Sequence, residues 1–66
     1  MKEQRVRIGL RIKELREAQG FSQIQLAEAI GTHEGNIRRI ELGKYDISFD
    51  VLQSIAECLG KRIDFI

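Results

Sequence analysis

The feature that most constrains this fold is a turn of only three residues between two short helical patterns. Apolar residues recur at helical spacing over residues 23–30, and the pattern ends at Gly31, a residue suited to the left-handed conformation at a helix C-terminus. Only Thr32 and His33 then precede a second helical pattern over residues 34–42, which another glycine closes. Two short helices joined by so tight a turn must cross at a steep angle, so the sequence predicts a helix-turn-helix unit.

Further helical patterns lie on both sides of this pair. Residues 5–19 form an amphipathic pattern, and residues 49–59 form another that Ser48 can cap. Ser22 and Gln25 have the spacing of a capping box, which predicts the start of the helix over residues 23–30. The chain has no proline and no repeat, so we expect one all-α domain of four helices spanning the whole chain. The residues expected to face the core are Val6, Ile8, Ile12, Leu15, Ala18, Phe21, Leu26, Ala27, Ile30, Ile37, Ile40, Leu52, Ile55, Ala56, Cys58 and Leu59.

The length of 66 residues limits how large the core can be. A core of this size gives a net stability of only a few kcal/mol unless a metal, a disulfide or a partner chain adds to it. Cys58 is the single cysteine, so it cannot form an internal disulfide, and one cysteine with one histidine cannot complete a structural zinc site. We therefore expect a homodimer in a reducing compartment.

Composition excludes several classes of protein. No apolar run approaches the roughly 20 residues that span a bilayer, and no apolar stretch follows the basic N-terminus as a signal peptide requires. We therefore expect a cytoplasmic protein without a membrane partner. One histidine, one cysteine and no glycine-rich phosphate loop leave no nucleophile–base pair or metal-ligand set, so neither an enzyme nor a cofactor is expected.

Several short motifs follow one another at fixed spacing. They are Gly20-x-Ser22-Gln23, the pair Leu26-Ala27, the turn residue Gly31, and Ile37-x-x-Ile40-Glu41-x-Gly43-Lys44. Together they resemble the phage Cro and lambda-repressor-like helix-turn-helix family of DNA-binding domains, over roughly Ile8 to Gly60. The resemblance implies a lambda-repressor-like bundle of four helices, with the second and third forming the helix-turn-helix and the third lying in the major groove of double-stranded DNA.

The resemblance places base reading on the helix over residues 34–42. A helical wheel points Ile37 and Ile40 to the core and Arg39 outward. Arg39 is the first candidate, because its guanidinium can give two hydrogen bonds to guanine O6 and N7. A phosphate contact by the same side chain is the alternative. Arg38, on the flank of this helix, is expected to contact DNA or to pair with Glu34.

Glu34 and Gly35 are unusual residues for the start of a recognition helix. Glu34 interacts favourably with the helix dipole and with Arg38 four residues later. It is alternatively a reader of the cytosine N4 amino group, or a charge that repels wrong sites. Gly35 costs about 1 kcal/mol of helix propensity. The family usually has a longer polar residue there, so Gly35 is expected to let the backbone approach the groove or to leave room for the arginines.

Phosphate contacts are expected from the edges of the helix-turn-helix. Gln23 matches the family position that hydrogen-bonds the DNA backbone at the start of the second helix. Asn36 and Lys44 are further candidates, with His33 or Arg11 as weaker ones. For His33 the alternative is an ordinary surface residue without a binding role.

Two charged residues are expected to be structural. Arg16 and Glu41 match positions that form an ion pair in similar domains and join the first helix to the third. At the start of the third helix His33 stands where the family often has a serine or threonine cap. Thr32 is the alternative source of that cap.

The C-terminal residues raise the question of how the chain dimerises. Ile63 and Phe65 alternate with charged residues, which favours a strand. A lone strand in a helical domain has unpaired edges, so pairing with the same strand of a second subunit is the simplest arrangement. A short fifth helix at the dimer interface is the alternative, and Ile66 is expected in the interface in either case.

The favoured function is a sequence-specific transcriptional regulator, in particular a repressor, bound as a dimer to a near-palindromic operator. Its half-sites would lie one helical turn apart, at about 34–36 Å. The alternative is an antitoxin that also represses its own operon, which would add a toxin protein as a partner.

Overall fold

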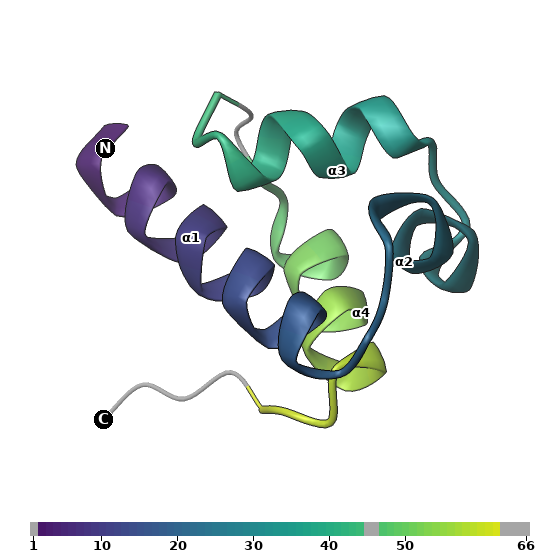
Figure 1. The fold of residues 1–66 in the computed structure, drawn as a ribbon. Coiled ribbons are helices and arrows are strands. Elements are labelled where there is room, and N and C mark those ends of the chain that lie inside the picture. The colour runs from purple at the N-terminus through teal and green to yellow at the C-terminus, as the bar shows by residue number, and fades with distance from the viewer. Residues whose placement is uncertain (1, 45–46, 63–66) are drawn as a thin grey trace.

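The computed structural model describes residues 2–44 and 47–62, which form four α-helices and, within these ranges, no strand. The helices are α1 (Lys2–Ala18), α2 (Gln23–Ile30), α3 (Glu34–Glu41) and α4 (Phe49–Cys58) (Figure 1). The predicted all-α fold is confirmed, and α2 has its predicted bounds. The first helix begins three residues before the predicted Arg5, whereas α3 and α4 each end one residue early, with Leu42 and Leu59 as C-caps.

The ends of α2 are fixed by local hydrogen bonds. The Ser22 hydroxyl accepts from the Gln25 N–H at 3.0 Å, and the Ser22 N–H donates to Gln25 Oε1 at 2.9 Å. At the other end Gly31 has φ +77°, the left-handed region that favours glycine. The Thr32 N–H then donates to the Ala27 carbonyl oxygen at 2.9 Å, which closes the last turn. The tight turn between α2 and α3 is therefore built as the sequence predicts.

The start of α3 differs from expectation. His33, in extended conformation, is the N-cap residue, and its side chain makes no capping hydrogen bond. The expectation that Thr32 supplies the cap is wrong. The backbone N–H of Thr32 closes the last turn of α2, and the residue lies one position before the N-cap of α3. Its hydroxyl oxygen accepts a hydrogen bond from Asn36 Nδ2 at 2.7 Å instead of from a backbone N–H of α3.

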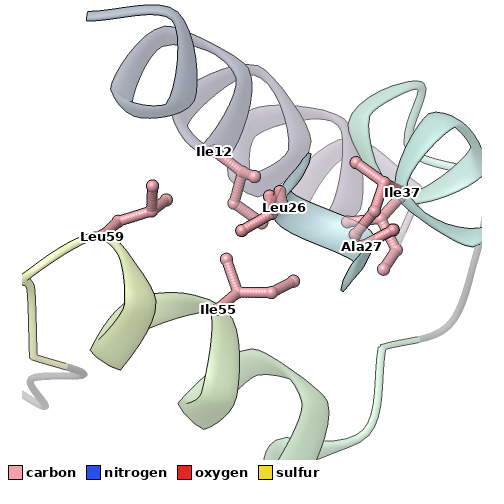
Figure 2. Packing of buried hydrophobic residues seen from close by; sticks show 7 residues of the cluster. Ile12, Leu26, Ala27, Ile37, Ile55 and Leu59 are labelled. Atoms are coloured by element: carbon pink, nitrogen blue, oxygen red, sulfur yellow. The ribbon is translucent and has the colours of Figure 1, made fainter. Parts of the chain in front are cut away.

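The core lies where the four helices meet. The second helix packs against α3 and α4, and α1 packs against α3. Figure 2 shows side chains from α1, α2, α3 and the end of α4 converging on this centre. The buried apolar residues in the described part of the chain are Ile12, Leu26, Ala27, Ile37, Ile40, Ile55 and Leu59.

Most of the remaining predicted core residues line the edge of this cluster. Half-buried side chains packed against it include Leu15, Phe21, Ile30, Leu52 and Cys58. The prediction is wrong for Ala18, which is exposed at the last position of α1. It is also wrong for Ile8, which is 38% exposed. Ile8 lines an open groove between α1 and α4 of about 470 Å³, which no helix among the described residues covers.

Gly9 marks the closest approach of α1 to α3. A Cβ atom at this position would overlap the Ile40 backbone oxygen and lie 2.7 Å from the Glu41 backbone oxygen. Backbone atoms cannot move aside as a flexible side chain can. A glycine is therefore required where these two helices touch. No helix in the described part of the chain has the length and apolarity to cross a membrane.

Candidate nucleic-acid interface

The third helix presents one buried and one exposed face. Ile37 and Ile40 are 0% and 1% exposed and hold the helix on the core. Arg38 and Arg39 are both exposed on the other side. Because α3 follows α2 after the tight turn, its outer face projects from the helix-turn-helix rather than towards α1 or α4 (Figure 1).

Glu34 and Arg38 form an ion pair on this surface. Arg38 Nη2 lies 3.4 Å from Glu34 Oε1, at the spacing of one helical turn, and the side chains are 56% and 41% exposed. An exposed pair of this kind contributes a few tenths of a kcal/mol to stability, about 0.3–0.5. The expected pairing of Glu34 with Arg38 is therefore present, and both groups remain accessible to a ligand.

Arg39 is held by a different contact. Its Nη2 donates a hydrogen bond to Asn36 Oδ1, and Asn36 Nδ2 donates to the Thr32 hydroxyl at 2.7 Å. The two polar contacts run along one strip of the helix surface, from the turn to the exposed arginine. Asn36, which the sequence suggests as a phosphate contact, thus already makes two hydrogen bonds within the chain.

Gly35 leaves an open position on the same helix. A Cβ atom placed there would meet nothing within 4 Å, and its φ lies outside the left-handed region. The fold therefore does not need glycine at this position. The consequence is a stretch of helix backbone with no side chain over it, next to the two arginines.

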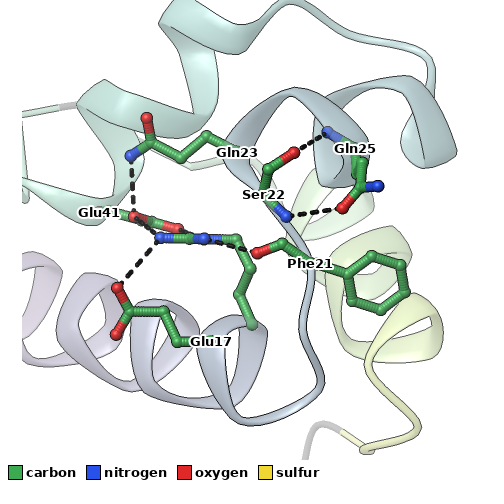
Figure 3. Close-up of polar contacts among 7 residues, drawn as sticks. Glu17, Phe21, Ser22, Gln23, Gln25 and Glu41 are labelled. Atoms are coloured by element: carbon green, nitrogen blue, oxygen red, sulfur yellow. Dashed lines mark hydrogen bonds and ion pairs between the residues drawn. The ribbon is translucent and has the colours of Figure 1, made fainter.

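A buried ion pair joins α1 to α3 behind the candidate interface. Arg16 Nε lies 2.6 Å from Glu41 Oε2 and Arg16 Nη2 lies 3.2 Å from Oε1, so the contact is bidentate (Figure 3). The two side chains are only 8% and 3% exposed. Arg16 Nη1 also donates to the Phe21 carbonyl oxygen at 2.7 Å, which reaches the loop before α2. The structure therefore contains the ion pair expected between Arg16 and Glu41.

Hydrogen bonding stabilises the charged form of this arginine. The hydrogen bond to Glu41 raises the pKa of Arg16 above its ordinary value, against an opposing effect of burial, and the charges of Glu41 and Glu17 act in the same direction as the hydrogen bond. Losing one partner would strand the other charge in the interior, which typically costs about 3–5 kcal/mol.

Gln23 connects this ion pair to the start of α2. Its Nε2 donates to Glu41 Oε1 at 3.0 Å, and the residue is half-buried (Figure 3). An amide nitrogen carries two hydrogens, so the bond to Glu41 uses one and fixes the direction of the other. The predicted phosphate contact at Gln23 thus has an oriented donor at the N-terminus of α2.

The other expected contacts lie in different places. Lys44 is exposed just beyond α3, and its N–H donates to the Arg39 carbonyl oxygen at 2.9 Å. His33 is exposed at the start of α3. Arg11 is not gathered with them, because it lines the groove between α1 and α4 and lies 3.4 Å from Glu14. The expected interface residues Ile63, Phe65 and Ile66 lie outside the described residues.

Sequence reasoning missed three residues with clear structural roles. Gly9 permits the contact of α1 with α3, and a glycine inside an apolar helical pattern was the available signal. Thr32 holds Asn36, and the signal was a pair of polar residues four apart. Gln19 Nε2 donates to the Leu59 carbonyl oxygen at 2.7 Å, and no sequence signal indicates that long-range bond.

Comparisons with known sequences agree with this geometry. The model of a family described as helix-turn-helix matches residues 12–66. A Pyrococcus furiosus protein, assigned by name as an HTH-type transcriptional regulatory protein, is 42% identical over 55 residues, which are 83% of this chain and 18% of that protein. The immunity repressor protein of Bacillus phage phi105 is 32% identical over 59 residues, which are 89% of this chain and 41% of that protein. The chain thus spans less than half the length of both sequence relatives.

Solved structures give the same picture of the fold. The restriction-modification controller protein C.AhdI of Aeromonas hydrophila superposes with a TM-score of 0.88 at 30% identity, over 92% of this chain and 88% of that one. The clp gene regulator ClgR of Corynebacterium glutamicum superposes with a TM-score of 0.85 at 28% identity, over 88% of this chain and 62% of that one. The names describe a controller protein and a gene regulator.

Proposed function

Because the chain belongs to the Cro and lambda-repressor-like helix-turn-helix family, we propose that it is a sequence-specific DNA-binding transcriptional regulator and acts as a repressor. The observation that carries the proposal is the outer face of α3. It is the second helix of the helix-turn-helix, and it exposes Arg38 and Arg39 while Ile37 and Ile40 fix it on the core. A rigid helix with exposed arginines suits the major groove, where base edges present acceptors.

Arg39 is the proposed base reader. It is exposed on the outer face of α3, and a guanidinium can donate two parallel hydrogen bonds to guanine O6 and N7. Such a contact discriminates against the wrong base by about 1–3 kcal/mol. Glu34 forms an exposed ion pair with Arg38. Its alternative proposed role is to accept a hydrogen bond from a cytosine N4 amino group. Gly35 has open space in place of a side chain, and its proposed role is to let the helix backbone approach the base edges.

Lys44 and Gln23 are the proposed phosphate contacts. Lys44 carries an exposed charge three residues after the end of α3, and the Gln23 amide, which gives one hydrogen to Glu41, lies at the start of α2. Helix N-termini and basic side chains are the usual partners of phosphate oxygens. Their role would be to fix the register of α3 in the groove rather than to read sequence.

The proposed regulator binds as a homodimer to a near-palindromic operator. Its two-fold axis would relate two copies of α3 about 34–36 Å apart, one turn of DNA. Support comes from the alternating residues Ile63 and Phe65, from the small core, and from the open apolar groove between α1 and α4. Arg62, the last residue that the structure describes, is among the residues that line that groove. Deleting residues 61–66 should yield a monomer in sedimentation; an unchanged dimer would defeat this interface.

Two substitutions that each remove one positive charge test the function. Duplexes bound by the wild-type protein are first selected from a random pool, and Kd is then measured on the best duplex and on its single-base variants. Arg39→Ala should reduce the preference at one base pair per half-site by about 5- to 150-fold, the factor that corresponds to one bidentate contact. Lys44→Ala is the matched control, and it should weaken binding to all duplexes alike and reduce the salt slope by about one unit.

Each step has an outcome that contradicts it. Selection without an enriched sequence would contradict the proposed function. Retention of every base preference in Arg39→Ala would remove Arg39 from base reading. A loss confined to one duplex in Lys44→Ala would contradict its role as a phosphate contact.

A further inference from the structure

A chain of two hydrogen bonds connects the turn between α2 and α3 to the exposed arginine. It runs from the Thr32 hydroxyl through the Asn36 amide to the Arg39 guanidinium. We infer that Asn36 is a positioning residue, which holds Arg39 in the orientation that reads one base pair and is itself held by Thr32. The inference rests on the proposed function and adds to it the residues that determine specificity through Arg39.

The chemistry of the hydroxyl, the amide and the guanidinium sets the donor and the acceptor of each hydrogen bond. A guanidinium only donates hydrogen bonds, so Asn36 must turn its Oδ1 towards Arg39. The amide nitrogen then points the other way, and Thr32 Oγ1 accepts from it at 2.7 Å. Since Oδ1 must face Arg39, an amide rotated by half a turn would place two donors against each other. Arg39 therefore determines which amide atom faces it, and Thr32 holds the amide in place through the other atom.

Thr32 is a fixed point because its backbone belongs to the end of α2. Its N–H donates to the Ala27 carbonyl oxygen at 2.9 Å, directly after the left-handed Gly31. Ala27 is 2% exposed in the core, and Thr32 itself is half-buried. The orientation of Arg39 is thus connected by hydrogen bonds to the C-terminal end of α2, which packs in the core.

These residues lie together in α3 and the turn before it. Arg39 follows Asn36 by three positions within the helix, a separation at which side chains are neighbours. Thr32 lies in the turn before the helix, within hydrogen-bond distance of Asn36. An arginine otherwise loses many rotamers when it binds, and ordering it beforehand reduces that cost. The bond to Asn36 uses one of the five guanidinium N–H groups. The contact with Asn36 therefore orders the Arg39 side chain before DNA binds.

A matched set of variants tests this role. The measured quantity is the ratio of Kd values for the best selected duplex and for the same duplex changed at the base pair that Arg39 reads. Asn36→Ala should lower this discrimination ratio about fivefold, the effect of one hydrogen bond. The same change in an Arg39→Ala background should leave the ratio unaltered. Thr32→Val, which removes the hydroxyl at nearly constant volume, should lower the ratio. Thr32→Ser, which keeps the hydroxyl, should leave the ratio at the wild-type value.

A second measurement follows the positioning without DNA. In the free protein, the Asn36 side-chain amide should show restricted motion in its 15N heteronuclear NOE, and Thr32→Val should release it while Thr32→Ser does not. Thermal melts establish that each variant is folded at the temperature of these experiments. The restriction holds whether or not DNA binds, so this arm separates a failed positioning role from a failed DNA-binding function.

Three results would overturn the inference. One is an Asn36 amide as mobile in the wild type as in Thr32→Val. Another is a uniform loss of affinity in Asn36→Ala with an unchanged ratio, which would make Asn36 a direct phosphate contact. The third is an equal loss of discrimination in Thr32→Val and Thr32→Ser, which would make the effect one of packing. A restricted amide in a wild-type protein that selects no duplex would instead contradict the proposed function.

Discussion

Two glycines in helices of this protein are predicted to respond in opposite ways to the same substitution. Gly9 lies within α1 and Gly35 is the second residue of α3. At Gly9 an added Cβ would overlap the backbone oxygen of Ile40 and lie 2.7 Å from that of Glu41, whereas at Gly35 it would meet no atom within 4 Å. Substitution by alanine therefore isolates the effect of helix contact from that of helix propensity.

The magnitudes follow from these surroundings. Overpacking that no flexible side chain can relieve costs up to about 3 kcal/mol, and the helix-propensity gain of about 1 kcal/mol offsets only part of it. We therefore expect Gly9→Ala to lower the free energy of unfolding by about 1–2 kcal/mol, which reduces Tm by about 4–16 °C in a domain of this size. Gly35→Ala should raise the free energy of unfolding by up to about 1 kcal/mol, with less than the full gain because the position lies in the first turn of α3.

Urea denaturation followed by circular dichroism measures both changes with the same baseline. A Gly9→Ala protein as stable as Gly35→Ala would refute the account of the α1–α3 contact. The DNA affinity of Gly35→Ala adds a second test, because the added methyl group should weaken binding to the selected duplex while it stabilises the fold. Unchanged affinity would show that this part of α3 does not approach the base edges.

The remaining predictions concern the buried ion pair. Glu41→Ala should lower the free energy of unfolding by about 3–5 kcal/mol because it strands the Arg16 charge. Glu17 is exposed and lies 3.7 Å from Arg16, so Glu17→Ala should lower it by less than about 1 kcal/mol. Equal losses in urea denaturation would contradict the buried pair. Because the pKa of Arg16 is raised above its ordinary value, the stability it provides is present at every pH below that ordinary value and is lost only as pH rises through the higher folded value. The loss of stability in Glu41→Ala should therefore be the same at pH 7 and pH 10, and a loss that shrinks towards pH 10 would contradict a charged arginine in the pair.

Local signals allowed much of the fold to be predicted. The bounds of α2 follow from a capping box and a left-handed glycine, both of which involve residues no more than four apart. Ser48 likewise starts α4 by accepting from the Val51 N–H at 3.3 Å. The apolar period of α3 identified Ile37 and Ile40 as buried. These features depend on the chain near them and hardly on the rest of the molecule.

Features set by distant contacts were harder to predict. The need for Gly9 comes from a neighbouring helix more than thirty residues away in sequence, and the exposure of Ile8 comes from the absence of a helix over its groove among the described residues. The pairing of Arg16 with Glu41 was expected only through family resemblance. Thr32 was expected to cap α3 with its side chain. Its backbone instead closes the last turn of α2, and its hydroxyl accepts from the Asn36 side chain.

At the candidate interface the sequence indicated which residues lie outward but not how they contact one another. Arg38 and Arg39 look alike in the sequence, yet one pairs with Glu34 and the other with Asn36. That difference arises from the side chains one turn away, and it is the reason that we propose Arg39 rather than Arg38 as the base reader. It also changes the expected role of Asn36.

The central claim is that α3 reads a base pair through Arg39, and selection of bound duplexes from a random DNA pool tests it most directly. The predicted result is an enriched, near-palindromic sequence whose half-sites lie one turn apart and each contain a fixed G·C pair, which is lost from the enriched set when Arg39→Ala is used for selection. Half-sites made of A·T pairs alone, or a G·C pair that Arg39→Ala still selects, would contradict the claim.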